Sequence, residues 1–142
     1  MSVDPVPAGP SAALRASVAG LAALRLGIGG WAALRPRQVA ESVGVAPEQR
    51  EAAVPYVRAL AARELLLAVG TFMAYRRGRS GAGWVAAIAA SDAFDALVYE
   101  LLAELGTLDA AKAHRSTVFA MSGAVPEAVT AIALMRAGRT DD

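Results

Sequence analysis

Residues 116–135 decide the fold class, and they read STVFAMSGAVPEAVTAIALM. Glu127 is the one charged side chain in this stretch. A helix on the surface of a soluble protein carries a charged face, whereas a helix that is apolar on all sides is covered by lipid or by a large protein core. A chain of 142 residues is too short to build such a core. The stretch therefore favours a membrane-spanning helix.

Three more apolar stretches precede it, at residues 16–34, 54–75 and 82–105. Each has about the twenty residues that a helix needs to cross the hydrocarbon core of a bilayer. The links 76–81 and 106–114 are short, which favours antiparallel neighbours. We expect an all-α protein, an antiparallel four-helix transmembrane bundle, in which residues 11–137 form one domain between tails at 1–10 and 138–142. The longer link 35–53 has room for a short interfacial helix between Pro36 and Pro47. The alternative is a soluble helical bundle whose many alanines inflate the hydropathy.

The composition excludes several classes of function. The chain is 56% hydrophobic and 19% charged, with a mean hydropathy of +0.41, whereas soluble domains are roughly 25% charged. The net charge is +1 and the arginines are spread along the chain, which argues against nucleic-acid binding. Without cysteine, and with a single histidine, the chain offers no thiol nucleophile and no His-rich or Cys-rich metal site. We expect neither a metal nor a cofactor.

The orientation in the membrane depends on the basic residues near the ends of the spans. Residues 2–10 contain no basic n-region, so we expect a tail there instead of a signal peptide. Six arginines fall on one side of the bundle and five basic residues on the other: Arg15, Arg76, Arg77, Arg79, Arg136 and Arg139 against Arg35, Arg37, Arg50, Lys112 and Arg115. The densest group, RRGR at residues 76–79, places that side and both termini in the cytoplasm. We therefore expect a multi-pass protein of the cytoplasmic membrane.

Six charged side chains interrupt the apolar stretches near their middles, namely Arg25, Arg63, Glu64, Asp92, Asp95 and Glu127. An isolated charge at the centre of a bilayer costs about 2.5 to 3.5 kcal/mol even on the lenient insertion scale. The six side chains are therefore expected to face each other inside the bundle. Two guanidiniums stand against four carboxyls, so a proton or a cation is needed at this depth to reduce the repulsion.

Asp92 and Asp95 are three residues apart on one helix face, and Tyr99 follows one turn later. Two carboxyls so placed can share a proton, so that one serves as a general base and the other as a general acid, with Arg63 between them. The alternative is a buried ion-pair network that only fixes the register of the helices.

Two helix faces carry small residues. Gly123 and Thr130 flank the Pro126–Glu127 pair and make a kinked, polar face in the fourth stretch. In the first stretch, small residues recur every three or four positions on the side opposite Arg25: Ala16, Gly20, Ala23, Gly27 and Gly30. Such a stripe suits close contact between helices, and we expect it to meet a second subunit in a homodimer.

Three runs carry a family resemblance: LRLGIGGWAALRP at residues 24–36, YVRALAARELLLAVG at residues 56–70, and AASDAF at residues 89–94. Together they resemble a family of small four-span membrane proteins catalogued as a domain of unknown function, DUF4267. The match covers most of residues 24–96 and depends on an arginine followed by an acid in the second span and an aspartate in the third. Fungal members or look-alikes belong to polyene natural-product pathways and are thought to open epoxides. The resemblance therefore implies that Arg63, Glu64 and Asp92 carry chemistry.

The charged set suits such chemistry apart from the resemblance. Soluble limonene-epoxide hydrolases use an Asp, Arg, Asp arrangement on an unrelated fold, so the likeness is one of site only. We expect a membrane enzyme of natural-product biosynthesis that adds water or an internal hydroxyl to an epoxide in a lipophilic substrate. Catalytic roles are expected for Asp92, Asp95, Arg63 and Glu64, and supporting or substrate-binding roles for Arg25, Tyr99, Glu127 and Tyr56. One alternative is a small proton-coupled multidrug exporter with Glu127 or Glu64 as the coupling group, and another is a purely structural bundle.

Overall fold

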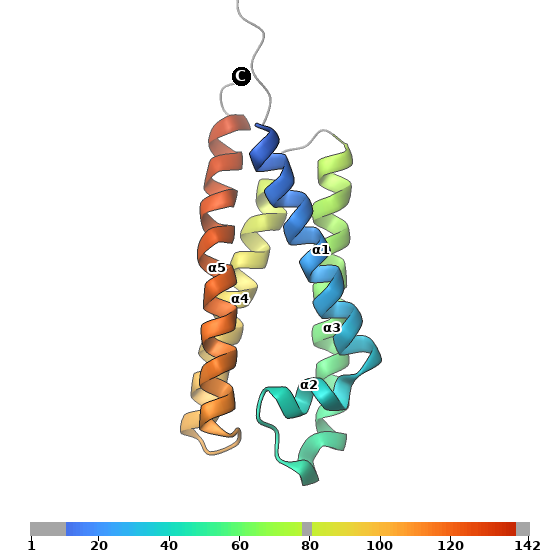
Figure 1. Cartoon of the computed structure of the whole chain (residues 1–142), viewed down its shortest axis with the longest axis vertical. Coiled ribbons are helices and arrows are strands. Elements are labelled where there is room, and N and C mark those ends of the chain that lie inside the picture. Colours follow the sequence, from blue (N-terminus) through green and yellow to red (C-terminus); the bar gives the residue numbers. More distant parts are fainter. Residues whose placement is uncertain (1–10, 78–80, 139–142) are drawn as a thin grey trace, which may run out of the picture.

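The computed structural model describes residues 11–77 and 81–138, and it is all-α within these ranges. It contains five α-helices, α1 (Ala12–Leu34), α2 (Pro36–Ser42), α3 (Arg50–Arg76), α4 (Ala82–Glu104) and α5 (Ala110–Gly138), with a turn of 3₁₀ helix, η1 (Pro47–Gln49), before α3 (Figure 1). The expected all-α class is confirmed. The four long helices correspond to the four apolar stretches, and α2 with η1 occupies the link 35–53. The expected tails lie outside the described residues, except for Gly138, which ends α5, and so do Arg79 and Arg139.

Local signals in the sequence set the helix ends. The Ser11 side chain accepts a hydrogen bond from the backbone N–H of Leu14 and caps α1, and Asp109 does the same for Lys112 at the start of α5. Pro36 and Pro47 occupy first-turn positions of α2 and η1, where the missing N–H costs no helical hydrogen bond. The starts of these helices are therefore explained by residues that the sequence shows directly.

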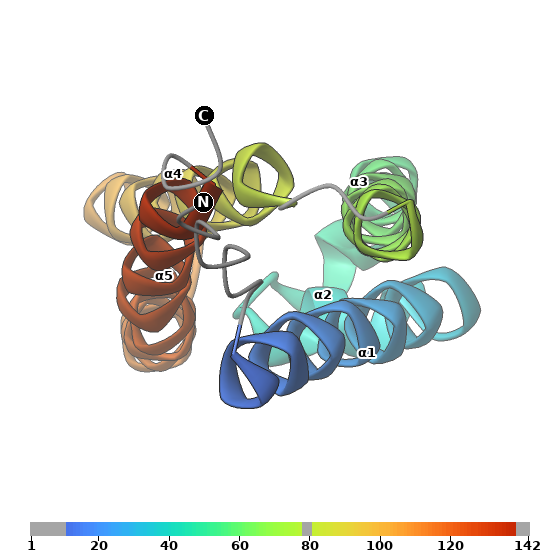
Figure 2. The ribbon, with the colours of Figure 1, turned by 90° about the horizontal axis from the view of Figure 1, so that it is seen from above.

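The long helices form two pairs, as Figure 2 shows from above: α1 packs against α3, and α4 packs against α5. Near the start of α1, an apolar cluster of Val18, Ala82, Val85, Ala131 and Leu134 joins α1, α4 and α5. At the other end, a second cluster packs α2 onto α1 and α3 and contains Ala32, Val39, Ala40, Val57 and Ala61. The start of α1 and the end of α5 lie at the same end of the molecule (Figure 1).

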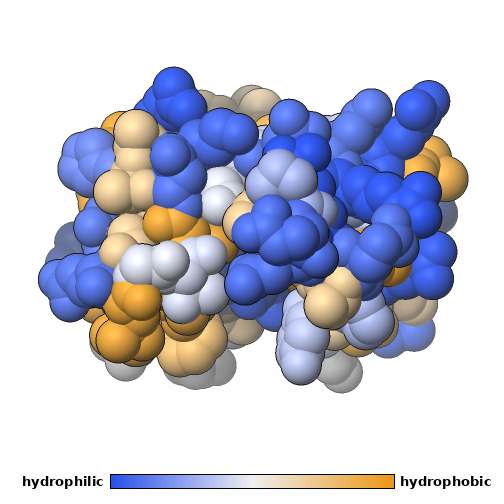
Figure 3. Space-filling view, turned by 90° about the horizontal axis from the view of Figure 1, so that it is seen from below, coloured by the Kyte–Doolittle hydropathy of each residue, from blue (hydrophilic) through white to orange (hydrophobic). Residues whose placement is uncertain are grey.

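Ion pairs hold α2 to the beginning of α3. Arg37 pairs with Glu51, and the Arg50 guanidinium lies 3.2 Å from the Glu41 carboxylate. The hydrogen bond to Glu51 raises the pKa of Arg37 above its ordinary value. This end of the molecule, seen from below in Figure 3, is largely hydrophilic.

The small-residue stripe of α1 faces outward. A Cβ added at Gly20 or Gly27 would meet no atom within 4 Å, whereas at Gly29 it would lie 2.9 Å from Leu65. Gly29 therefore allows the close approach of α1 to α3, and the stripe is left on the outer face of the helix. The homodimer stays a prediction.

Two helices are long and apolar enough to cross a membrane, α1 over Ala12–Leu34 and α5 over Ala110–Ala137. The number of long helices equals the four expected spans. Among the described residues, however, only α1 and α5 qualify as spans by length and composition, so the four-span bundle stays a prediction. Charged residues near the middle of α3 (Arg63 and Glu64) and of α4 (Asp92 and Asp95) lower the hydropathy of the other two long helices.

Candidate active site

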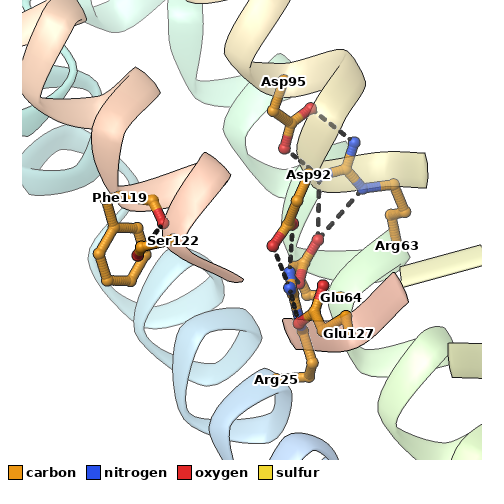
Figure 4. Close-up of polar contacts among 8 residues, drawn as sticks. All are labelled: Arg25, Arg63, Glu64, Asp92, Asp95, Phe119, Ser122 and Glu127. Atoms are coloured by element: carbon orange, nitrogen blue, oxygen red, sulfur yellow. Dashed lines mark hydrogen bonds and ion pairs between the residues drawn. The ribbon is translucent and has the colours of Figure 1, made fainter. Parts of the chain in front are cut away.

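Arg25 lies at the centre of the bundle with 4% of its surface exposed. Its Nη1 donates to Glu64 Oε2 at 2.8 Å and to Asp92 Oδ1 at 2.7 Å. Its Nη2 donates to Glu127 Oε1 at 2.7 Å and also to Asp92 Oδ2. These four side chains come from α1, α3, α4 and α5, so one guanidinium binds to all three of the other long helices (Figure 4).

A second guanidinium extends this network. The Arg63 side chain, 33% exposed, donates to Asp95 through both Nη atoms, with Nη1 at 2.8 Å from Asp95 Oδ1. Its Nη2 also lies 2.9 Å from Glu64 Oε1. Because the other oxygen of Glu64 accepts from Arg25, Glu64 bridges the two arginines. All six mid-depth charges thus belong to one network, which we call the charged cluster: Arg25, Arg63, Glu64, Asp92, Asp95 and Glu127.

The pairing within the charged cluster differs from the expected one. We expected Arg63 to lie between Asp92 and Asp95, but it binds only Asp95 of the two, and Asp92 binds Arg25. Positions three apart on a helix are turned by about 60°, so the two carboxyls of α4 reach different neighbours. The group between two carboxyls at the centre is therefore Arg25, which the sequence argument had given only a supporting role.

The two tyrosines singled out in the sequence differ in position. Tyr99 is half-buried and lines the cavity described below, near the charged cluster. Tyr56 is 78% exposed and does not line that cavity. Tyr56 precedes Arg63 by seven residues, about 10 Å along α3, so it lies beyond the reach of the charged cluster. The structure does not bring Tyr56 to this site, and its expected supporting role stays a prediction.

An elongated cavity of about 520 Å³ lies against the charged cluster. Apolar side chains such as Leu24, Ile28, Trp31 and Phe119 supply most of its wall, and α2 contributes Val39 and Val43. Towards the start of α1 and the end of α5, the apolar cluster of α1, α4 and α5 fills the interior, and none of its five buried residues lines the cavity. The charged cluster therefore forms the closed end of an apolar cavity.

Two carboxyls meet at one nitrogen atom. Asp92 Oδ2 and Glu127 Oε1 both accept from Arg25 Nη2, so these oxygens lie within about 5 Å of each other. Glu127 Oε2 and Arg25 Nε are buried and have no hydrogen-bond partner among the described residues. Gly123 makes the arrangement possible, since a Cβ there would lie 2.8 Å from Asp92 Oδ2. The site thus combines Asp92, whose two oxygens both accept hydrogen bonds from Arg25, with Glu127, which has one oxygen without a hydrogen-bond partner.

The described residues contain no group of three or more histidine, cysteine or acidic side chains arranged to hold a metal ion. The carboxyls of the charged cluster point at guanidiniums, which occupy the position that a cation would take. The charged cluster contains two guanidiniums and four carboxyls, so the excess of carboxyls predicted from the sequence is present in the folded chain.

No protein-family model, curated protein or solved structure matches the chain. The resemblance to the four-span family stays a prediction.

Proposed function

We propose that the chain is an integral membrane protein whose four long helices cross the bilayer. The support is an inverted distribution of polarity. Along residues 17–34, 59–75, 82–99 and 116–135, every charged side chain is buried or half-buried, while large apolar side chains point outward. Leu66 is 68% exposed, Leu97 70% and Val129 62%. A chain in water buries such residues and exposes its charges, whereas lipid requires the reverse.

In this arrangement the start of α1 and the end of α5 lie on one side of the membrane, and the arginines of the RRGR sequence at residues 76–79 favour the cytoplasm for that side. The test is fractionation of cells that express the full chain. We expect the protein in the membrane pellet, resistant to carbonate and released by detergent. A monodisperse protein in the soluble fraction, without detergent, would overturn the proposal.

We further propose that the protein is an enzyme that opens an epoxide in a lipophilic substrate by general acid–base catalysis. One observation carries this proposal: an apolar cavity ends on two carboxyls, Asp92 and Glu127, that share the guanidinium of Arg25. The apolar wall suits the body of such a substrate, and the charged cluster suits a reaction that needs an acid and a base together.

The proposed step uses Asp92 as the base and Glu127 as the acid. Asp92 accepts hydrogen bonds from Arg25 with both of its oxygens and is assigned as the base, while Glu127 retains one oxygen that can carry a proton. Asp92 takes a proton from water, or from a hydroxyl of the substrate, as that oxygen bonds to an epoxide carbon. The electrons of the breaking C–O bond move to the epoxide oxygen, which takes the proton of Glu127. Proton return from Asp92 to Glu127 restores the site.

The other members of the charged cluster are positioning residues. Arg25 keeps the two reacting carboxyls together, and Glu64 fixes Arg25 from the side of α3. Arg63 donates to the second oxygen of Glu64 and is itself bound by Asp95. Such support keeps the reacting groups in one geometry, which is where much of the rate of a positioned reaction originates.

The test is turnover of mid-chain epoxides of long-chain acids and alcohols by the purified chain in detergent, with the diol measured by mass spectrometry. Asp92→Asn is nearly isosteric and is expected to lower turnover about 10²-fold or more. Glu104→Gln removes an exposed carboxylate at the end of α4 and is the control that keeps activity. Full activity of both Asp92→Asn and Glu127→Gln would overturn the mechanism.

The exporter expected as the alternative is less favoured, because the guanidiniums of Arg25 and Arg63 already bind the carboxyls that a cationic cargo would need. Proteoliposomes distinguish the two functions. Cation uptake that is driven by a pH gradient and lost in Glu127→Gln, without turnover of any epoxide, would replace the enzyme with the exporter.

A further inference from the structure

Four residues of α5, each about one helical turn from the next, line the cavity. Arg115, Phe119, Gly123 and Glu127 follow each other at intervals of four residues, and all four line the cavity. From Arg115 to Glu127 the helix rises about 18 Å. The cavity is therefore long enough for an extended aliphatic chain, with the charged cluster at one end and Arg115 at the other.

Arg115 is an unpaired cation at its end of the cavity. Within residues 11–77 and 81–138 it has no carboxylate partner and no side-chain hydrogen bond. The nearby serines cannot replace it as donors to an anion, since Ser116 donates to the Lys112 carbonyl and Ser42 to the Val39 carbonyl. Lys112 does not line the cavity, and its ammonium reaches the backbone carbonyl of Glu41 instead. Arg115 is thus the group at this end that can bind an anion.

We propose that the ligand of the cavity is an elongated amphiphile with an anionic head group, bound with its head on Arg115 and its tail towards the charged cluster. This proposal rests on the proposed function, because it takes the cavity as the substrate site. The opposite orientation would bring an anion against the charged cluster, where carboxylates outnumber guanidiniums even when Glu127 carries a proton. The net negative charge of the cluster repels an anion at short range. Trp31 and Phe119 supply apolar wall for the tail.

The depth of Arg115 suits a ligand that comes from the bilayer. Arg115 directly precedes the apolar stretch 116–135, so it lies where the lipid head groups begin. An amphiphile already in the membrane has its head at that depth and its chain in the core. It can therefore enter between the helices without moving its charge through the hydrocarbon. A carboxylate and a phosphate share the required chemistry, since a guanidinium binds both in a two-pronged geometry.

Tryptophan fluorescence provides the test, because Trp31 lines the cavity and the chain contains one other tryptophan, Trp84, which does not. In Trp84→Phe, Trp31 is the reporter, and a bromine atom near the middle of a bound aliphatic chain quenches it. The probes are a brominated stearic acid, the matching brominated alcohol and the matching alkyl phosphate, each at equal amounts per detergent micelle. If Trp84→Phe fails to fold, the unaltered chain is used and unbrominated acid or alcohol displaces the brominated acid.

The acid is expected to bind at least about tenfold more tightly than the alcohol, the scale of one hydrogen bond to a charged group. Arg115→Gln is expected to remove this preference. Arg136→Gln, which removes an exposed arginine in the last turn of the same helix, is expected to keep it. The phosphate arm shows which head group is preferred, and either preference over the alcohol supports the proposal. Equal affinity for acid and alcohol, or equal loss in the two arginine variants, would overturn it.

The outcomes separate this proposal from the proposed function. Asp92→Asn is expected to lose turnover and to keep the preference for the acid. If turnover depends on Asp92 but no anionic preference is found, only the head-group proposal fails. If the preference depends on Arg115 but no epoxide is opened, only the enzymatic function fails.

Discussion

Replacing Arg25 by methionine tests whether this guanidinium holds the bundle together. Methionine keeps a similar volume of apolar chain, so the change removes the charge without a large cavity. It also leaves Glu64, Asp92 and Glu127 buried without the cation that binds them; their side chains are 2%, 9% and 0% exposed. Removing one partner of a buried ion pair costs about 3 to 5 kcal/mol. Because three carboxyls lose one shared partner, we expect the free energy of unfolding to fall by about that amount or more.

Two comparisons isolate the origin of this loss. Arg63→Met removes the other guanidinium, whose side chain is 33% exposed, and water can replace part of its contacts. We expect a loss of about 1 kcal/mol there, as for ion pairs that solvent reaches. Adding Asp92→Asn to Arg25→Met neutralises the carboxyl that used both oxygens on Arg25. The double variant is therefore expected to be more stable than Arg25→Met alone by about 0.5 to 3 kcal/mol, the usual range of coupling between contacting residues.

The assay is reversible unfolding in mixed detergent micelles with increasing dodecyl sulfate, followed by the helical signal in circular dichroism. The control is Arg136→Met, an exposed arginine in the last turn of α5, which is expected to change the midpoint little. If Arg25→Met and Arg63→Met cost the same, or if Asp92→Asn worsens the Arg25 variant, the central role assigned to Arg25 is refuted.

Three glycine substitutions test the packing of the helices. A Cβ at Gly70 would lie 2.5 Å from the Trp84 ring, so Gly70→Ala is expected to cost about 1 to 3 kcal/mol of unfolding free energy. At Gly20 a Cβ would meet no atom within 4 Å, so Gly20→Ala is expected to gain up to about 1 kcal/mol of helix propensity. Equal stability of Gly70→Ala and Gly20→Ala in the micelle assay would contradict the close contact of Gly70 with Trp84. Gly123→Ala places a Cβ 2.8 Å from Asp92 Oδ2 and is expected to lower epoxide turnover about tenfold or more with unchanged helical content. A fully active Gly123→Ala would show that the position of the Asp92 carboxylate is not critical.

Local information in the sequence was enough to place the helices. Helix length, the prolines at 36 and 47 and the apolar runs are properties of neighbouring residues, so the four long helices and the short α2 could be predicted. The sequence also determined that six charges lie near the middles of these helices, since depth along a span is a matter of counting residues. That all six must be paired within the protein followed from the cost of an isolated charge in lipid.

Only the tertiary structure decided which of these charges meet. Counting residues gives the depth of a side chain but not the direction in which each helix is turned or which helices are neighbours. Asp92 and Asp95 differ by about 60° around α4, and the packing of α1 against α3 and of α4 against α5 sends Asp92 to Arg25 and Asp95 to Arg63. The cavity is likewise a property of the space between α1 and α5, to which no single stretch of sequence corresponds. The sequence could therefore determine the helices and the charges at their centres, but the central place of Arg25 depends on how the helices pack.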